Sequence, residues 1–279
     1  MSKFINKINR LYTKLQNPNK KKITKLNIID SFPMFTAHGL GSYSMRAKLT
    51  IQSINDTVLA LSEFINKKKT DDKFKILLQN ILIKKDNSND FRLKKLFKYY
   101  GSDKSTVHNY YKIYTYLLRS IKAPRKIFEI GLGTNNPDVV STMGTHGKPG
   151  ASLRAFRDFQ KSCLIYGADF DKRILFKENR IQTFFVDQTN LKTFKNLPLK
   201  IGSDFDLMID DGLHSPNANL NSLNFFLKNI KVGGYAVIED ININTEPIWN
   251  IVSQLIKFNF ISAFIKTKTA CMFIVKREK

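Results

Sequence analysis

From residue 126 onward, short apolar runs alternate with longer amphipathic stretches, and this alternation constrains the fold more than any other feature of the sequence. The short runs predict strands at residues 127–130, 164–168, 181–186, 205–209 and 235–238. The amphipathic stretches predict helices at residues 152–160, 172–179, 219–228 and 247–257. Because helical crossovers join parallel strands, the sequence predicts an α/β fold around a mostly parallel sheet.

The end of the chain departs from this alternation. Two apolar runs, residues 260–265 and 272–276, are separated by too few residues to hold a helix. We therefore expect them to pair as a hairpin, which adds an antiparallel edge to the parallel sheet.

The first part of the chain is helical in pattern and strongly basic. Apolar residues recur at helical spacing over residues 4–15, 51–67, 74–83 and 91–100. Lys and Arg outnumber Asp and Glu by 46 to 23, and most of the excess lies in the first 125 residues. Codon bias explains part of this excess, and an anionic partner, such as a phosphate-bearing substrate or a membrane surface, is the alternative. We expect a mainly helical accessory region at residues 1–95 and a second domain at residues 96–279.

Cysteine content and hydropathy indicate the compartment. The two cysteines, Cys163 and Cys271, cannot make a disulfide framework, which favours a reducing compartment. No apolar run approaches the roughly 18 residues that a membrane span needs, and the amino terminus is too polar for a secretory signal. We expect a soluble, cytoplasmic protein, and a homo-oligomer is compatible with the sequence.

The first three predicted strands end in residues that suit a nucleoside ligand. The run Glu129-Ile130-Gly131-Leu132-Gly133-Thr134 places a glycine-rich turn after the first strand but lacks the third glycine of the dinucleotide fingerprint. Asp169 ends the second strand, where a carboxylate suits a ribose diol, and Asp187 and Gln188 after the third can bond an adenine edge. Each acid alone would fit a turn or a helix cap. Together they predict a cationic adenosine ligand without phosphates.

The fourth and fifth predicted strands bring more acids to the same edge of the sheet. Asp210 and Asp211 follow one strand, Glu239 and Asp240 follow the other, and His214 lies three residues after Asp211. Clustered carboxylates repel one another unless a cation or a proton neutralises them. Hard oxygen ligands favour Mg²⁺ over zinc, so the sequence predicts a magnesium site.

Residues from about 96 to 245 resemble the class I S-adenosylmethionine-dependent O-methyltransferases that modify sugars, typified by the macrocin and mycinamicin enzymes. The resemblance rests on the glycine-rich run above, Gly147-Lys148-Pro149-Gly150-Ala151-Ser152, Tyr166-Gly167-Ala168-Asp169, Asp210-Asp211-Gly212-Leu213-His214, Ile238-Glu239-Asp240, and an upstream segment with Tyr100-Gly101-Ser102-Asp103-Lys104, His108 and Tyr110. It implies a Rossmann-like fold with a seven-stranded, mostly parallel sheet that ends in an antiparallel hairpin.

The resemblance also implies the cofactors, S-adenosylmethionine and Mg²⁺, and a role for each site residue. Asp211, Glu239 and Asp240 would bind the metal, and His214 would be the general base, with Asp211 beside it in the catalytic set. The candidate donor-binding residues are Glu129, Gly131, Gly133, Thr134, Ser152, Asp169, Asp187, Gln188 and Asp210. His108 fits either the acceptor pocket or a structural hydrogen bond.

The acceptor implied is a sugar hydroxyl, carried by a nucleotide-activated sugar, by a surface polysaccharide unit such as a capsular heptose, or by a glycosylated metabolite. An NAD-dependent oxidoreductase is disfavoured by the missing third glycine and the acid-rich strand ends. A nucleic-acid methyltransferase is the first alternative, although Asp210-Asp211-Gly212-Leu213 stands where an Asn/Asp-Pro-Pro-aromatic motif is expected. A basic binding module with a degenerate methyltransferase fold is the second. We expect no stable complex with nucleic acid.

Overall fold

The computed structural model describes residue 58 and residues 72–279. The predicted helix at residues 4–15 lies outside the described residues, as does the one at 51–67 apart from residue 58. The described residues from 72 onward belong to one compact unit, residues 64–279.

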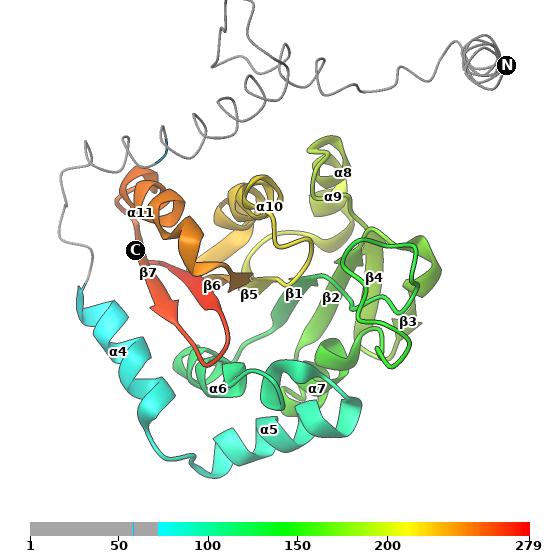
Figure 1. The fold of residues 1–279 in the computed structure, drawn as a ribbon, viewed down its shortest axis with the longest axis horizontal. Coiled ribbons are helices and arrows are strands. Elements are labelled where there is room, and N and C mark those ends of the chain that lie inside the picture. The colour runs from blue at the N-terminus through cyan, green and yellow to red at the C-terminus, as the bar shows by residue number, and fades with distance from the viewer. Residues whose placement is uncertain (1–57, 59–71) are drawn as a thin grey trace, which may run out of the picture. The chain divides into compact units, whose positions relative to one another are not determined.

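A sheet of eight strands forms the centre of this unit (Figure 1), in the order β3-β4-β2-β1-β5-β6-β8-β7. The strands are β1 (Lys126–Ile130), β2 (Leu164–Asp169), β3 (Lys177–Glu178), β4 (Ile181–Phe185), β5 (Phe205–Asp210), β6 (Ile230–Ile241), β7 (Phe260–Lys266) and β8 (Cys271–Arg277). The pairs among β4, β2, β1, β5 and β6 are parallel, whereas β8 pairs antiparallel with β6 and β7. The predicted parallel sheet with a terminal hairpin is confirmed. The strands number eight instead of seven because the short β3 pairs antiparallel with β4.

Helices cover both faces of the sheet (Figure 1). One face carries α4 (Asp72–Ile83), α5 (Ser88–Tyr100), α6 (Tyr110–Ser120) and α7 (Ala151–Phe159), and the other carries α8 (Lys192–Lys195), α9 (Leu197–Ile201), α10 (Pro216–Asn229) and α11 (Glu246–Leu255). Short turns of 3-10 helix are η1 (Asp103–Ser105), η2 (Lys172–Ile174) and η3 (Ile243–Thr245). The predicted helices at 152–160, 219–228 and 247–257 are confirmed as α7, α10 and α11. Within the described residues, none of the helices combines the length and the apolar composition of a membrane span.

Alternate residues of each strand face the two helix layers, which produces two apolar cores. In β1, Ile127 packs in the core of the α6–α7 face and Phe128 in the core of the α10 face. The same period of two turns Glu129 of β1 and Glu239 of β6 toward α7 and α6, where they bond side chains of those helices. Asp210, at the end of β5, faces α10 instead. The alternation therefore places Glu129 and Glu239 on the same face of the sheet and Asp210 on the other.

The predicted helix at residues 172–179 is wrong. This segment forms the turn η2 followed by the edge strand β3. The Asp171 carboxylate caps the turn by accepting a hydrogen bond from the Arg173 backbone N–H at 3.1 Å. The backbone N–H and C=O of Phe176 both bond the Thr183 hydroxyl of β4, each at 2.6 Å, which ties the segment to the sheet in extended form. The short helices α8 and α9, which follow β4, have no counterpart among the predicted helices.

α4 and α5 are the described part of the predicted accessory region, and they pack on the same core as the sheet. Phe74 and Leu78 of α4 and Phe97 of α5 are buried in the core of the α6–α7 face. Phe97 meets Phe156 of α7 edge to face, with ring centroids 5.3 Å apart. The division of the chain at residue 95 stays a prediction.

The end of β1 and the end of β5 approach each other closely at Gly131. The Asp211 backbone N–H donates to the Ile130 carbonyl at 2.8 Å, and Gly131 itself has a φ of 94°. A Cβ atom on Gly131 would lie 1.9 Å from the Asp211 backbone oxygen. Only glycine combines this backbone conformation with this approach.

We predict that Gly131→Ala lowers the free energy of unfolding by about 3 kcal/mol, because the added methyl displaces the Asp211 backbone in addition to straining its own. Gly233→Ala is the matched control, since Gly233 also has a positive φ, of 79°, but a Cβ there meets nothing within 4 Å. The control should lose about 1 kcal/mol. Urea unfolding of both variants checks this, and equal losses would contradict the close approach.

Candidate active site

A cavity of about 500 Å³ lies at the carboxyl ends of the parallel strands, where ligands bind in open α/β sheets. Most of the predicted site residues line it, namely Gly131, Gly133, Thr134, Ser152, Asp169, Asp187, Gln188, Asp211, His214 and Asp240. Glu129, Asp210 and Glu239 are fully buried and do not line the cavity. The structure therefore brings the predicted residues to one place but puts these three acids behind the cavity wall.

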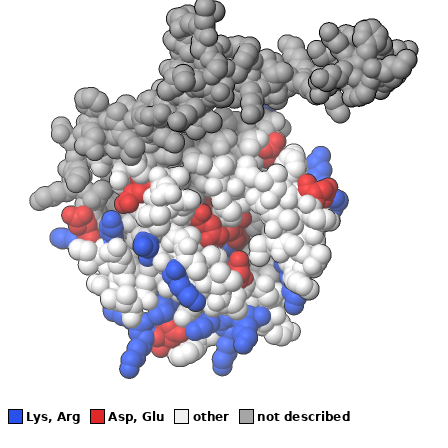
Figure 2. Space-filling model, in the orientation of Figure 1, with Lys and Arg blue, Asp and Glu red and all other residues white. Residues whose placement is uncertain are grey.

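The charge around the site differs from that of the whole chain. In the space-filling view, acidic side chains gather near the middle of the face shown, and Lys and Arg lie mostly toward its edge (Figure 2). This distribution suits a ligand or an ion with positive charge, although the chain carries a formal charge of +23.

Asp169 holds the glycine-rich loop and also lines the cavity. Its Oδ2 accepts from the Leu132 backbone N–H at 2.7 Å, and its Oδ1 accepts from the Asp171 backbone N–H at 2.8 Å. Burial raises the pKa of Asp169, and these backbone hydrogen bonds act against that rise. Each carboxylate oxygen keeps a lone pair that can accept from a ligand hydroxyl.

Asp171 is a buried loop-holding residue that the sequence analysis missed. Its Oδ2 accepts from Thr134 Oγ1 at 2.7 Å and from Asn136 Nδ2 at 2.6 Å, and its Oδ1 accepts from Arg173 Nε at 2.7 Å. The hydrogen bond from Arg173 is the main cause that lowers the pKa of Asp171. The signal was present in the sequence as a second Asp two places after Asp169, on the same side of an extended segment.

Gln188, which lines the cavity, bonds Asp210 behind the cavity wall. Gln188 Nε2 donates to Asp210 Oδ1 at 2.8 Å, and Asn219 Nδ2 of α10 donates to Asp210 Oδ2 at 3.0 Å. Gln188 Oε1 accepts from the Leu213 backbone N–H at 2.8 Å, which fixes the turn after β5. The partners of Asp210 are thus protein groups that shape this turn, and its contact with a donor stays a prediction.

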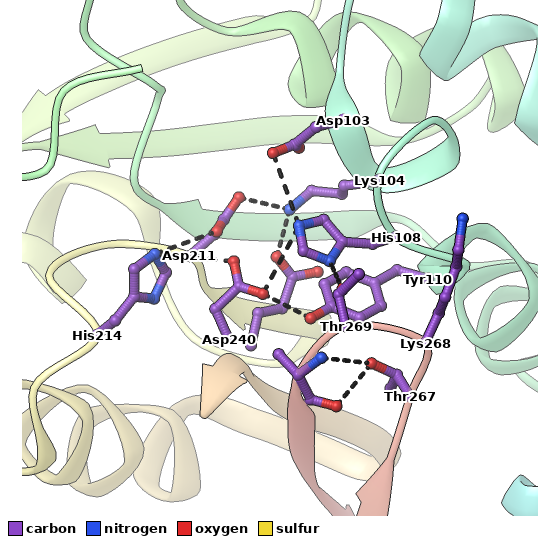
Figure 3. Close-up of polar contacts among 12 residues, drawn as sticks. Asp103, Lys104, His108, Tyr110, Asp211, His214, Asp240, Thr267, Lys268 and Thr269 are labelled. Atoms are coloured by element: carbon purple, nitrogen blue, oxygen red, sulfur yellow. Dashed lines mark hydrogen bonds and ion pairs between the residues drawn. The ribbon is translucent and has the colours of Figure 1, made fainter. Parts of the chain in front are cut away.

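Three side chains on the rim could hold a metal ion. Asp211, His214 and Asp240 each offer one ligand atom, and these atoms lie within 4.8 Å of one another. His214 Nε2 is 3.8 Å from Asp211 Oδ1 and 3.8 Å from Asp240 Oδ2 (Figure 3). Two carboxylates and one imidazole at this spacing fit a small divalent cation. This Asp211–His214–Asp240 group differs from the predicted metal set, which contains Glu239 in place of the histidine.

The backbone is strained at two members of this group. His214 has a φ of 55° and Asp240 a φ of 52°, in the left-handed region that few residues other than glycine adopt. At Asp240 the pairing of β6 with β8 also changes register. Tyr110 Oη donates to Asp240 Oδ1 at 2.5 Å and fixes the carboxylate in this position. Strain of this kind persists where surrounding contacts over-determine the conformation, and it clusters at functional sites.

A buried lysine lies beneath the rim group. Lys104 Nζ is 2.5 Å from Asp211 Oδ2 and 3.3 Å from Glu129 Oε1, and it also donates to Glu239 Oε2. Ser152 Oγ donates to Glu129 Oε2 at 2.7 Å. The sequence analysis included Lys104 in the upstream segment but gave it no role. Its partners are far away in the sequence, so no local pattern indicates them.

The charged forms of Lys104, Glu129 and Glu239 stabilise one another. Burial raises the pKa of Glu129 and of Glu239, because removal from water penalises a carboxylate, and the Lys104 ammonium opposes that rise. Burial also opposes the charge on Lys104, but Asp211, Glu239 and Glu129 outweigh it and raise the pKa of Lys104 well above its usual range. Each of these groups therefore needs the others to remain charged.

A second histidine approaches the rim group from the opposite side (Figure 3). His108 Nε2 is 3.8 Å from Asp103 Oδ2 and 3.8 Å from Asp240 Oδ1, and the ring stacks on Tyr110 with centroids 4.5 Å apart. Its Nδ1 bonds Thr269 Oγ1 in the turn between β7 and β8. The structure thus places His108 beside the acids and also gives it a structural hydrogen bond.

Comparisons with known proteins agree with the motifs, although no protein-family model matches the chain. The 8-demethyl-8-alpha-L-rhamnosyl tetracenomycin-C 2'-O-methyltransferase of Streptomyces olivaceus is 26% identical over 149 residues, which are 53% of this chain and 37% of that protein. Demethylmacrocin O-methyltransferase of Streptomyces fradiae is 35% identical over 92 residues, 33% of this chain and 23% of that protein. The chain thus matches less than half the length of these curated relatives.

A solved structure of the MycE methyltransferase of mycinamycin biosynthesis, in complex with Mg and SAH, has the same fold. It superposes with a TM-score of 0.54 at 21% sequence identity, over 67% of this chain and 55% of that one. A second structure of that enzyme, which also contains mycinamycin VI, gives a TM-score of 0.53. The chain is therefore a sequence relative of macrocin and rhamnosyl-tetracenomycin O-methyltransferases, and it has the Rossmann-like fold of methyltransferases.

Proposed function

We propose that this protein transfers a methyl group from S-adenosylmethionine to a sugar hydroxyl, with the help of a divalent cation. The observation that carries the proposal is one cavity with two kinds of wall. The glycine-rich loop with Asp169 forms one side of it, and the Asp211–His214–Asp240 group forms another. A donor and a cation-assisted acceptor would then meet in a single cavity.

The donor side has the groups that a cationic adenosine ligand needs. Gly131 and Gly133 line the cavity on the glycine-rich loop, and both have positive φ. Asp169 offers carboxylate lone pairs toward the cavity, while its backbone hydrogen bonds hold it in place. Asp187 lines the same cavity, and among the described residues its side chain bonds only its neighbour Thr189. It therefore keeps acceptor capacity for a ligand.

The rim group supplies what a sugar hydroxyl lacks as a nucleophile. S-adenosylmethionine would bring an electrophilic methyl group, and Mg²⁺ beside Asp211 and Asp240 would lower the pKa of the acceptor hydroxyl. His214, which lines the cavity and is about one-third exposed, would accept the proton of that hydroxyl. Rigid placement of Asp240 by Tyr110 would help to hold the acceptor in line with the methyl group.

The names of the sequence relatives support a sugar hydroxyl as the acceptor, because the tetracenomycin enzyme is named for a methyl transfer at a rhamnosyl 2' position. A nucleotide-activated sugar, a capsular heptose unit and a glycosylated metabolite all carry such a hydroxyl. Two free, buried thiols, Cys163 and Cys271, agree with a cytoplasmic site of reaction.

The test is a transfer assay with S-adenosylmethionine, Mg²⁺ and a panel of these three acceptor classes, read by mass spectrometry for the gain of one methylene unit. We expect turnover on at least one class. Excess chelator should abolish it and Mg²⁺ should restore it, while calorimetric donor affinity stays largely unchanged, because the donor side does not use the rim group. Full turnover in chelator would remove the metal from the proposal, and failure to bind the donor would remove the methyl transfer.

We predict that His214→Asn lowers turnover by about 10²–10⁴-fold, the usual contribution of general-base assistance. Asn tolerates the positive φ at this position, so the fold and the donor affinity should be retained. His108→Asn is the matched control, because His108 also faces Asp240 but from the other side. Steady-state rates should fall much less in the control, and a larger loss for His108→Asn would transfer the base role to His108.

A further inference from the structure

We propose that Lys104 is a built-in cation that competes with the divalent ion for the carboxylates of the active site. It acts as a positioning residue, because it holds Asp211 and Glu239 without lining the cavity itself. The inference rests on the proposed function in one respect: Asp211 and Asp240 of the rim group are taken to bind a divalent cation, with His214 beside them as the base.

The position of Lys104 is unusual for a lysine, since its side chain is only 1% exposed. It stands on η1, after Ser102 caps this turn, and it lies between three carboxylates that come from the ends of β1, β5 and β6. Within the described part of the chain, Lys104 is the only cationic side chain that forms an ion pair with Glu129 or with Glu239. Buried charges of one sign are costly unless a cation pairs with them.

Asp211 is shared between this lysine and the rim. Its Oδ2 is 2.5 Å from Lys104 Nζ, and its Oδ1 faces His214 at 3.8 Å. A divalent ion at the rim group would therefore bind a carboxylate that already neutralises an ammonium. Two cations on one carboxylate repel each other strongly at such short range, so Lys104 must weaken the binding of the ion.

Glu239, like Asp211, is already bonded to Lys104. One of its oxygens accepts from Lys104 and the other from Tyr114. The metal set that the family resemblance implies contains Glu239, but this carboxylate can join it only by releasing Lys104. The predicted set and the observed group then describe two states of one site. In one state Lys104 holds Glu239, and in the other the divalent ion does.

Lys104 also connects the acceptor side with the donor side. Glu129 Oε1 is fully buried, has no hydrogen-bond donor among the described residues, and lies 3.3 Å from Lys104 Nζ. The other oxygen of Glu129 bonds Ser152, which lines the cavity at the start of α7. If the ion takes both Asp211 and Glu239, Lys104 can shift toward Glu129, the third carboxylate that it contacts, and need not enter the cavity.

The experiment compares the wild type with Lys104→Met, which keeps a long, unbranched side chain and removes its charge. Lys98→Met is the matched control, because Lys98 lies on the exposed side of α5 near its end. Calorimetry with Mg²⁺ gives the affinity, and thermal unfolding in chelator and in excess Mg²⁺ gives the stability, so neither readout needs turnover. We expect Lys104→Met to bind Mg²⁺ at least about tenfold more tightly than the wild type and the control. Its melting temperature should fall in chelator and recover with Mg²⁺ more than that of the wild type.

A double variant keeps the test decisive if Lys104→Met unfolds in chelator. Lys104→Met combined with Glu239→Gln removes the ammonium and one of its counter-charges together. It should melt higher in chelator than Lys104→Met alone and lose most of the gain in Mg²⁺ affinity. A merely structural lysine would also couple to Glu239 in stability, because the two residues are in contact, but Lys104→Met would then show no gain in Mg²⁺ affinity for the second substitution to remove.

The outcomes separate this inference from the proposed function. Equal or weaker Mg²⁺ affinity in Lys104→Met overturns the inference, even if the wild type binds Mg²⁺ and transfers methyl groups. Binding of Mg²⁺ by Lys104→Met but not by the wild type supports the inference and removes the metal from the wild-type reaction. Absence of binding in both proteins overturns the competition outright.

Discussion

The contact of one buried ammonium with three carboxylates organises the active end of this fold. Lys104 reaches from η1 to Glu129 of β1, to Asp211 just after β5 and to Glu239 of β6. The two fully buried acids, Glu129 and Glu239, could not stay ionised behind the cavity wall without a cation. The cavity lies directly above this layer, between the glycine-rich loop and the rim group. Lys104 thus joins the two sides of the cavity, because it pairs with Glu129, which bonds Ser152 on the donor side, and with Asp211 on the acceptor side.

The sheet could be predicted because its information is local. Short apolar runs located β1, β2, β4, β5 and the centre of β6, and the missing space for a helix located the β7–β8 hairpin. The period-two alternation of the strands also predicts the face of the sheet on which each acid lies. It places Glu129 on the face of Ile127 and Asp210 on the face of Met208. That alternation alone separates Asp210, which bonds α10, from its neighbour Asp211 on the rim.

The rest depends on contacts between distant parts of the chain. The segment at residues 172–179 has helical periodicity, but Thr183 bonds its backbone and holds it as a turn and an edge strand. Lys104 lies 107 positions from Asp211 and 135 from Glu239 in the sequence, so its role could not be predicted from any motif. The left-handed backbone at His214 and Asp240 likewise could not be predicted, because His and Asp tolerate this conformation without requiring it, and contacts with the rest of the fold impose it.

The central claim is that a methyl donor and a divalent cation occupy neighbouring parts of one cavity. The most direct measurement is a crystal structure of the protein with Mn²⁺ and S-adenosylhomocysteine, in which anomalous scattering locates the metal. We predict a manganese peak bonded to Asp211 and Asp240, with the nucleoside against residues 131–134 and Asp169. A nucleoside bound outside this cavity, or manganese remote from both carboxylates, would contradict the account.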